Sequence, residues 1–191
     1  KPFVYTFAID HLGLSPCTPV PNLPVTIETA NGVPWSPKEA GKVEQNGEMH
    51  PLSWGLARSR NNYSAWIMKQ AKQPQAVANF IHNMGIHSYI DPVPALCLGT
   101  SESNVYEMVS AFSTFANEGV YTTPIFVTRI EDRQGNLIAS FAPRTQDAIS
   151  EHTAYTMLTM LEGVIRSGTG GRLGWAYNCL LYTSDAADEE D

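Results

Sequence analysis

The sequence of 191 residues is short of cysteine, of positive charge and of long apolar runs. Its three cysteines, Cys17, Cys97 and Cys179, form no close pair and match no metal-ligand spacing, which gives a disulfide framework or a zinc site little support. Twelve basic residues against 19 acidic ones leave a net charge of −7, which argues against a nucleic-acid partner. No apolar run approaches the roughly 18 to 20 residues that span a bilayer, and no signal peptide opens the chain.

The acidic excess is concentrated at the C-terminal end of the chain. Five acidic residues lie within 185–191, whereas residues 1–178 carry 12 basic and 14 acidic residues and are nearly neutral. The stretch 179–191 has no periodicity, differs in composition from what precedes it, and resembles a translated sequencing adapter. We therefore expect residues 1–178 to belong to one domain and residues 179–191 to be a non-native tail.

Apolar residues at helical spacing predict most of the regular structure. Lys1–Gly13 is typical of a helix whose first turn holds Pro2, where a missing N–H breaks little, so we expect the helix to start just before Lys1. Further helices are expected over 51–59, 63–72, 74–84 and 104–118, and one after Ser150. The polar cluster 59–62 separates two of them, because Ser and Asn side chains compete for backbone hydrogen bonds.

Two of these helices have start signals and an expected buried face. Asn104 is expected to cap one helix while Glu107 bonds back to it, and Ser150 is expected to cap the other. The residues expected to be buried are Val105, Met108, Val109, Phe112 and Phe115 in the first helix, and Ala154, Met157, Leu158, Leu161 and Ile165 in the second.

Extended structure is expected in two places. Residues 15–50 are rich in Pro, Gly, Asn and Ser, which predicts an irregular segment with short extended pieces. Residues 124–131 and 137–141 are β-rich runs around the turn residues 132–136, which predicts a hairpin. Helices clustered in the middle, followed by a late hairpin, indicate an α+β domain rather than alternating βαβ units.

Ordinary catalytic signatures are missing, since the chain has no G-x-S-x-G elbow, no H-E-x-x-H pair and no Walker loop. The glycine-rich run 168–171 follows a helix and predicts a turn rather than a phosphate loop. Two local signals remain: Lys1 at the first turn of an apolar helix, and Ser59-Arg60-Asn61 between two helices. Each has an ordinary structural explanation, because a lysine at a helix start is usually solvated and Ser59 can cap the helix that follows.

Other short segments accompany these two signals in a recognisable order. They are Lys1-Pro2-Phe3, Trp35-Ser36-Pro37-Lys38, Leu56-Ala57-Arg58-Ser59-Arg60-Asn61, Leu98-Gly99-Thr100-Ser101-Glu102, Glu107-Met108, 113–121, and Ile130-Glu131-Asp132 with Gly135-Asn136. The pattern resembles the transpeptidase domain of bifunctional (class A) penicillin-binding proteins, with S-x-x-K-P-F, W-x-P-x and A-R-S-x-N boxes, from Lys1 to about Asn178. The resemblance implies an α+β, serine β-lactamase-like fold with helices on an antiparallel sheet.

The resemblance also implies acyl transfer through a serine nucleophile in peptidoglycan crosslinking. In this family a serine three residues before the motif lysine attacks the D-Ala-D-Ala bond of a stem peptide, D-Ala leaves, and an amine of a neighbouring strand completes the crosslink. Lys1 occupies the lysine position and would act as the base, because one helical turn brings its amine beside that serine. Ser59 would relay a proton and Asn61 would hydrogen-bond the substrate backbone, with Arg60 as the variable middle residue.

Two family features fall outside the sequence, because the serine would precede Lys1 and the K-T-G strand would follow the 168–173 region. We therefore expect a domain incomplete at both ends, and a 191-residue chain that forms no penicilloyl adduct by itself. The parent protein would carry a membrane anchor and a glycosyltransferase domain on the extracytoplasmic (periplasmic) face of the cytoplasmic membrane. Its partners would be stem peptides and β-lactams, with no nucleic acid and with neither a metal nor an organic cofactor.

Two alternatives stay open at this point. A D,D-carboxypeptidase or a serine β-lactamase shares the fold and the S-x-x-K logic but transfers the acyl group to water. A catalytically silent penicillin-binding-like module would recognise cell-wall peptides or a β-lactam without turnover. The matches between Glu107 and Gly135 favour the bifunctional synthase over the first alternative, and a serine three positions before Lys1 with a K-T-G motif downstream would favour catalysis over the second.

Overall fold

The computed structural model describes residues 1–29 and 31–176, and in them it combines helices with short strands. The helices are α1 (Pro2–Leu12), α2 (Leu52–Ala57), α3 (Asn61–Ala71), α4 (Pro74–Asn83), the 3-10 helix η1 (Pro94–Leu98), α5 (Val105–Ala116), α6 (Glu151–Ser167) and α7 (Gly171–Ala176). The strands form antiparallel pairs, β1 (Pro19–Pro21) with β4 (Met49–Pro51), β2 (Ile27–Glu28) with β3 (Pro34–Trp35), β5 (Val120–Thr122) with β8 (Thr145–Asp147), and β6 (Arg129–Glu131) with β7 (Leu137–Ser140). The α+β class is as predicted, and the tail predicted over 179–191 lies outside the described residues.

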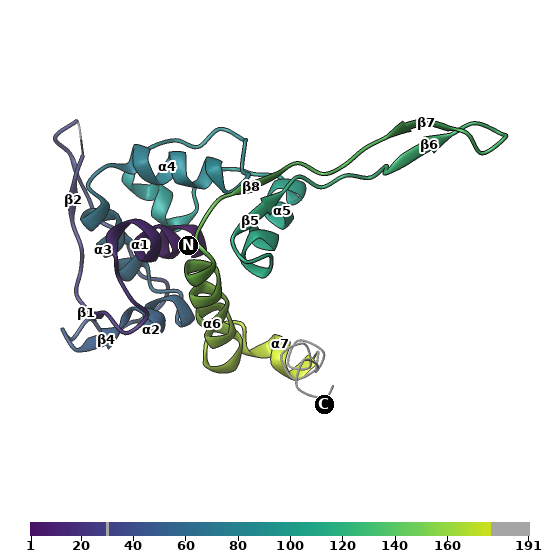
Figure 1. Ribbon diagram of the computed structural model, residues 1–191. Helices are drawn as coiled ribbons and strands as arrows, with labels where there is room; N and C mark the ends of the chain where they lie inside the picture. Colours follow the sequence, from purple (N-terminus) through teal and green to yellow (C-terminus); the bar gives the residue numbers. More distant parts are fainter. Residues whose placement is uncertain (30, 177–191) are drawn as a thin grey trace.

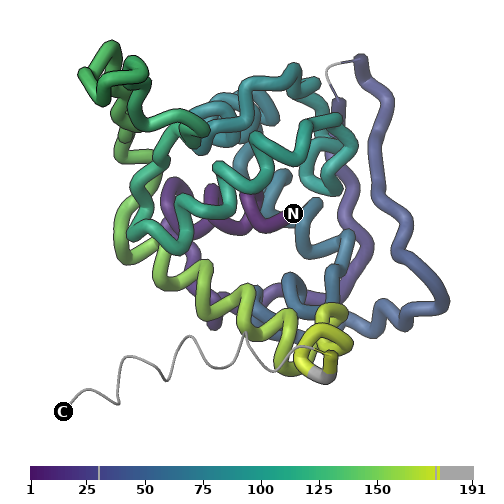
Figure 2. The backbone as a smooth tube through the Cα atoms, turned by 90° about the vertical axis from the view of Figure 1, so that its right-hand side faces the viewer, coloured from purple at the N-terminus to yellow at the C-terminus, as the bar shows by residue number. Residues whose placement is uncertain are grey.

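Helix α1 lies at the centre of the molecule, between α3, α4 and α6 (Figures 1 and 2). Every residue from Phe3 to Ile9 is buried, so the helix is enclosed on all sides. A helix that is apolar around its whole circumference is stable only in such a core position. Gly13 closes it in the left-handed conformation at a φ of 65°, as the sequence predicts. The surrounding core thus fixes the start of α1, where Lys1 stands.

Helices α2 and α3 meet at a short turn that is held from both sides. Gly55 in α2 faces Tyr63 in α3 so closely that a Cβ at residue 55 would lie 2.2 Å from the ring. The Tyr63 side chain is fully buried, and its hydroxyl donates to the Val20 carbonyl at 3.0 Å. Close packing between the two helices leaves only residues 58–60 to reverse the chain, which fixes the path of the turn.

Helix α5 begins as predicted, but the hydrogen bonds of Glu107 differ from the prediction. The Asn104 side chain accepts a hydrogen bond from the Glu107 N–H at 2.9 Å. The predicted return bond from Glu107 is wrong, because its carboxylate instead accepts from the Ser88 and Ser103 hydroxyls at 2.6 and 2.9 Å. It also accepts from the N–H groups of residues 87 and 88, which have no helical partner. A buried carboxylate therefore joins α5 to the preceding loop.

The predicted buried stripe of α5 is correct in part. Phe115 is buried, and Met108 and Phe112 are partly buried against the core, but Val105 and Val109 are 79% and 59% exposed. The buried residues of α5 include small and hydroxyl residues, Ser110, Ala111 and Thr114, and the helix contacts α6. The two hydroxyls can be buried because they donate to carbonyls one turn back in the same helix, Ser110 at 2.7 Å and Thr114 at 3.4 Å.

Helix α6 starts at the predicted cap, where the Ser150 hydroxyl accepts from the Thr153 N–H at 3.1 Å. Ala154 and Met157 are buried as predicted, whereas Leu158 is 37% exposed, because the packed face turns toward Thr153 and Met160. The predicted stripe is thus correct at Ala154 and Met157 and in part at Leu161, which is partly buried against the core, and it is wrong at Leu158.

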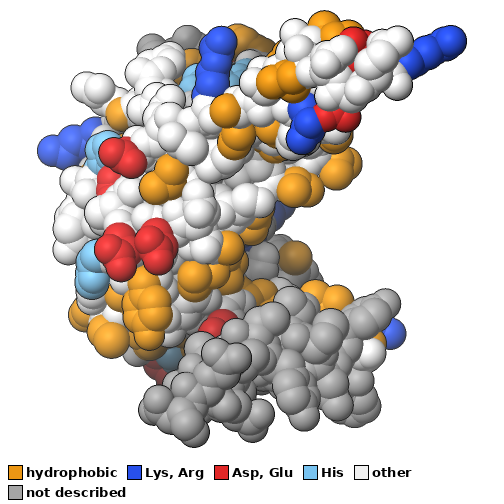
Figure 3. Space-filling model, turned by 45° about the vertical axis from the view of Figure 1, so that its right-hand side comes forward, with side chains coloured by type: hydrophobic (Ala, Val, Ile, Leu, Met, Phe, Trp, Pro, Cys, Tyr) orange, Lys and Arg blue, Asp and Glu red, His pale blue; other side chains and the backbone are white. Residues whose placement is uncertain are grey.

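The predicted hairpin of β6 and β7 forms and projects from the body (Figure 1). The Asp132 carboxylate accepts from the N–H groups of Gln134 and Asn136 at 2.9 and 2.8 Å, which shapes the turn. The first strand begins at Arg129, five residues later than the β-rich run. Apolar side chains are visible on this projection and on the adjoining body surface (Figure 3). Among the described helices, none is long and apolar enough to cross a membrane.

Candidate functional site

Lys1 stands at the N-terminal end of the buried helix α1, and its amine contacts residues of the turn between α2 and α3. Its Nζ atom lies 2.6 Å from the Ser59 carbonyl oxygen, 3.1 Å from Ser59 Oγ and 2.6 Å from Asn61 Oδ1. An ammonium group has three N–H donors, and three oxygens receive them here. The structure therefore brings together the three residues singled out in the sequence, although 58 and 60 positions separate them from Lys1.

Ser59 adopts a backbone conformation that is unusual for a residue with a side chain. Its φ is 53°, in the left-handed region, where the Cβ of an L-residue crowds the backbone. The turn is closed by hydrogen bonds from the Ser59 N–H to the Leu56 carbonyl and from the Arg60 N–H to the Gly55 carbonyl, both at 2.9 Å. This conformation lets the carbonyl and the hydroxyl of Ser59 both face Lys1.

Asn61 is the first residue of α3, and both ends of its side-chain amide are engaged. Oδ1 accepts from Lys1, while Nδ2 donates to the Lys38 carbonyl at 2.6 Å. This pattern fixes the orientation of the amide, because only the oxygen can accept from the lysine amine. The alternative that Ser59 caps α3 is wrong, because Arg60 holds the N-cap position and no side chain of the cap residue bonds the helix start.

The electrostatic surroundings lower the pKa of Lys1. Partial burial disfavours the charged ammonium and is the main cause, while the negative charge of Glu39 acts in the opposite direction. Burial also raises the pKa of the Cys97 thiol to about 12, so this neighbour is neutral near pH 7. A lysine with a lowered pKa spends more of its time as a neutral amine, which is the form that accepts a proton.

A small cavity opens beside Lys1. It has a volume of about 150 Å³, and its walls are mainly apolar, with Phe3, Ile86 and Leu96 among them. Ser101 and Glu102 line this cavity and also a more open, hydroxyl-rich groove of about 720 Å³. Residues 101–103 thus connect the lysine to a surface where a polar ligand has room. Within 1–29 and 31–176, no cluster of three or more His, Cys, Asp or Glu side chains is placed to hold a metal ion.

Sequence reasoning missed the polar side chains behind the turn. Arg60 was expected to be a variable residue, yet it is 7% exposed and lies against Glu39 and Asn22. Only one signal in the sequence pointed to this group, the position of Glu39 directly after the 35–38 segment. Asn22 lies in the irregular segment, where no periodicity marks a buried residue.

Comparison with known proteins agrees with this architecture. The family model of the penicillin binding protein transpeptidase domain matches residues 95–178. Penicillin-binding protein 1A of Neisseria meningitidis (strain Z2491) is 30% identical over 177 residues, which is 88% of this chain and 22% of the relative. Penicillin-binding protein 1B of Haemophilus influenzae is 27% identical over 176 residues, 91% of this chain and 22% of the relative. The chain thus spans about a fifth of the length of these relatives.

Solved structures show the same fold. The crystal structure of penicillin-binding protein 1A from Haemophilus influenzae superposes with a TM-score of 0.75 and 22% identity, covering 89% of this chain and 30% of that chain. The D,D-transpeptidase domain of a peptidoglycan glycosyltransferase from Eggerthella lenta gives 0.67 and 19%, covering 89% and 48%. Family model, relatives and fold thus agree in what this chain is similar to, which is part of the transpeptidase domain of penicillin-binding proteins.

Proposed function

We propose that this chain belongs to a peptidoglycan D,D-transpeptidase that crosslinks stem peptides through a serine acyl-enzyme. Lys1 is the general base, Ser59 relays a proton and Asn61 binds the substrate backbone. The observation that carries the proposal is the set of three contacts from the Lys1 amine to Ser59 and Asn61. A lysine, a hydroxyl and an amide that converge beside a cavity are suited to acyl transfer without a metal.

The chemistry of the three contacts separates the roles. The Ser59 carbonyl and Asn61 Oδ1 can only accept, whereas the Ser59 hydroxyl can accept from an ammonium or donate to a neutral amine. When Lys1 loses its proton, it keeps two N–H donors and gains a lone pair. Ser59 Oγ, at 3.1 Å, is the contact that can reverse its direction, so it is the partner able to exchange a proton with the base.

The proposed reaction balances as follows. The neutral Lys1 amine takes the proton of the nucleophilic serine, whose oxygen forms an ester with the penultimate D-Ala of the stem peptide. The C–N bond to the terminal D-Ala breaks, and the leaving amine receives a proton by way of Ser59. An acceptor amine then attacks the ester, forms the crosslinking amide and returns the proton to the serine oxygen through the same groups.

Related structures support the ligand side of the proposal. A penicillin-binding protein from Mycobacterium tuberculosis has been solved with aztreonam and with ampicillin, and PonA1 of that organism with penicillin V. We propose that the full protein likewise binds β-lactams as well as stem peptides, and that it works on the extracytoplasmic face of the membrane with an anchor and a glycosyltransferase domain. Residues 1–178 would be its transpeptidase part and 179–191 a non-native tail.

The test uses the full-length gene product and a fluorescent penicillin. We expect a covalent adduct whose peptide map places the label three residues before Lys1, and at least about a 100-fold slower acylation in Lys1→Met. Ser59→Ala and Asn61→Ala should bind the penicillin but acylate slowly. Absence of any adduct in the folded wild-type protein would refute the proposal.

Product analysis separates the alternatives. A transpeptidase converts two stem peptides into a crosslinked dimer, whereas a carboxypeptidase releases D-Ala and leaves monomers, and a β-lactamase releases hydrolysed penicillin. Reversible binding without an adduct would indicate the catalytically silent module. We expect the 191-residue chain alone to form no penicilloyl adduct, and a mass spectrum of the chain after incubation with penicillin checks this.

A further inference from the structure

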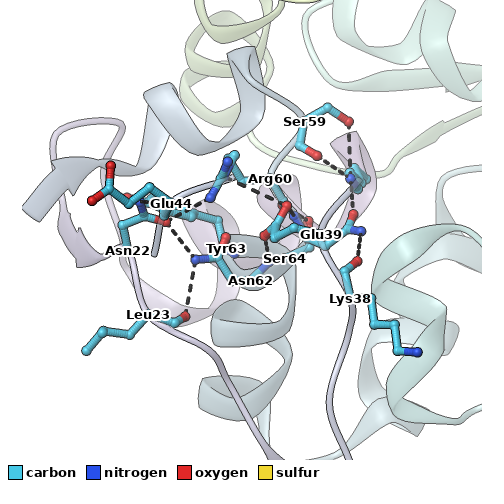
Figure 4. Close-up of polar contacts among 12 residues, drawn as sticks. Asn22, Leu23, Lys38, Glu39, Glu44, Ser59, Arg60, Asn62, Tyr63 and Ser64 are labelled. Atoms are coloured by element: carbon cyan, nitrogen blue, oxygen red, sulfur yellow. Dashed lines mark hydrogen bonds and ion pairs between the residues drawn. The ribbon is translucent and has the colours of Figure 1, made fainter. Parts of the chain in front are cut away.

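The residues of the 59–61 turn have contacts on two sides. Ser59 and Asn61 contact Lys1. Figure 4 shows Arg60 pointing away from Ser59, toward Asn22, and its side chain is buried there. Its guanidinium donates to Asn22 Oδ1 at 2.9 Å, and its Nε lies 3.8 Å from Glu39 Oε2. The guanidinium carbon also lies 5.6 Å from the centre of the Trp54 ring, within the range of a cation–π contact.

Glu39 binds the start of α3 directly. Its two carboxylate oxygens accept from the N–H groups of Asn61 at 3.2 Å and of Asn62 at 2.7 Å. The first N–H groups of a helix have no partner within the helix, and a negative charge there is favourable. The neighbouring Lys38 carbonyl holds the Asn61 amide at 2.6 Å. Residues 38 and 39 therefore fix both the backbone and the side chain of Asn61.

Asn22 ties the other side of this polar group. Its Oδ1 accepts from Arg60 and from Asn62 Nδ2, at 2.9 and 3.1 Å, and its own Nδ2 donates to the Glu44 carbonyl at 2.9 Å. Asn22 and Asn62 are 4% and 2% exposed. With 8% and 9% of their side chains exposed, Arg60 and Glu39 form a buried ion pair, so neither charge can be removed without leaving the other uncompensated.

We propose that Glu39 and Arg60 are positioning residues for acyl transfer, which hold Ser59 and Asn61 against Lys1 through the network with Asn22. The inference rests on the proposed function of Lys1, Ser59 and Asn61. It assigns a role to the residue between Ser59 and Asn61 and to a segment that lies more than 20 positions before the turn.

Glu39 also acts on Lys1 through its charge. The charged and titratable groups around Lys1 are Glu39 from the 38–39 segment, the Cys97 thiol from η1, and Glu102 on the cavity wall, with Arg60 on the far side of Glu39. The negative charge of Glu39 raises the pKa of Lys1 against the larger effect of burial. Removing that charge lowers the pKa further, which a loss of packing alone would not do.

The experiment measures penicillin acylation of the full-length gene product against pH, in the wild type and in Glu39→Gln. We expect acylation at the optimum to fall on the order of 10-fold to 100-fold, since small misplacements of catalytic groups have effects of this size. We also expect the acidic limb of the profile to move to lower pH. Glu28→Gln, the same change at an exposed position, is the matched control and should leave both unchanged.

Two further variants keep the test decisive if Glu39→Gln folds poorly. Glu39→Gln with Arg60→Met removes both buried charges together and should restore the melting temperature without restoring acylation. Glu39→Asp keeps the charge, so its acylation should slow while the acidic limb stays in place. An unchanged rate and profile in a folded Glu39 variant would overturn the inference.

A failure of the proposed function is distinguishable from a failure of this inference. If the wild-type protein is not acylated, competitive labelling of the Lys1 amine against pH, read by peptide mapping, still reports the effect of Glu39. A lower pKa of Lys1 in Glu39→Gln supports the charge effect that Glu39 is inferred to have on this amine, and an unchanged pKa overturns it.

Discussion

Replacing Ser59 by glycine and, separately, by alanine distinguishes the energy of its backbone conformation from the role of its hydroxyl. Both variants lose the contact from Ser59 Oγ to Lys1, but only glycine relieves the φ of 53°. The left-handed conformation costs an L-residue about 1–2 kcal/mol, while glycine loses roughly 0.5–1 kcal/mol more than alanine in chain entropy on folding. The glycine variant should therefore be more stable than the alanine variant by about 0.5–1 kcal/mol.

That difference is measurable by thermal unfolding, followed by tryptophan fluorescence. For a chain of 150–250 residues, 1 kcal/mol shifts Tm by about 2–4 °C, so we expect Ser59→Gly to melt roughly 1–4 °C above Ser59→Ala. Glu118, with the same φ of 53°, is a matched control away from Lys1. Its glycine variant should show the same advantage over its alanine variant, without loss of acylation in the full-length protein. An alanine variant of Ser59 that melts at or above the glycine variant would refute the reasoning.

Three further predictions concern the scaffold. Hydrogen bonds from serine hydroxyls lower the pKa of Glu107. The carboxylate therefore contributes stability above its unfolded pKa, and this contribution is lost as the pH falls through its folded pKa. Glu107→Gln should flatten the acid limb of a stability–pH curve, and an unchanged limb contradicts this. Gly168→Ala should destabilise by about 1–3 kcal/mol in urea unfolding, because the new Cβ would lie 2.2 Å from the Ala57 carbonyl. Phe115→Ala, at a side chain that is 1% exposed, should lower the free energy of unfolding by about 3–5 kcal/mol. Val109→Ala, at 59% exposure, should change it by no more than about 0.5 kcal/mol. Equal effects at these two positions would show that the buried face of α5 is misassigned.

Features of the fold that depend on neighbouring residues were predictable from the sequence. The caps at Asn104 and Ser150, the stop at Gly13 and the turn around Asp132 each involve groups within a few positions of one another. Such hydrogen bonds join groups that are close in the sequence, so the residue order alone favours them. The α+β class followed from the arrangement of these elements along the chain.

The faces of helices were less predictable, because packing partners decide them. An apolar count places Val109 on the buried face of α5, but the buried residues include Ser110 and Thr114, whose hydroxyls donate to carbonyls of the same helix. A hydrophobic pattern classes every Ser and Thr as polar, although a hydroxyl that donates to a carbonyl of its own helix can be buried. With the hydroxyl residues on the buried side, Val105 and Val109 lie on the exposed side of the helix.

The candidate site was predictable only in part. Lys1, Ser59 and Asn61 came from a resemblance, since nothing local links residues that are 58 and 60 positions apart. Glu39 and Asn22 remained hidden, because they reach the turn from an irregular segment without periodicity. Long-range polar contacts of this kind are fixed by the assembled core and leave no pattern in the sequence.

The titration of the Lys1 ε-amine tests the central claim most directly. Nitrogen-detected NMR of the lysine side chains, with Lys1→Arg used to assign the signal, gives its pKa in the folded chain. Burial beside Ser59 and Asn61 predicts a value below the ordinary 10.5 for this amine, and a further change in Ser59→Ala, which removes one of its three oxygen partners. A value of 10.5 or above that is unaffected by Ser59 would contradict the account, because such an amine would neither be poised as a base nor be in contact with its relay.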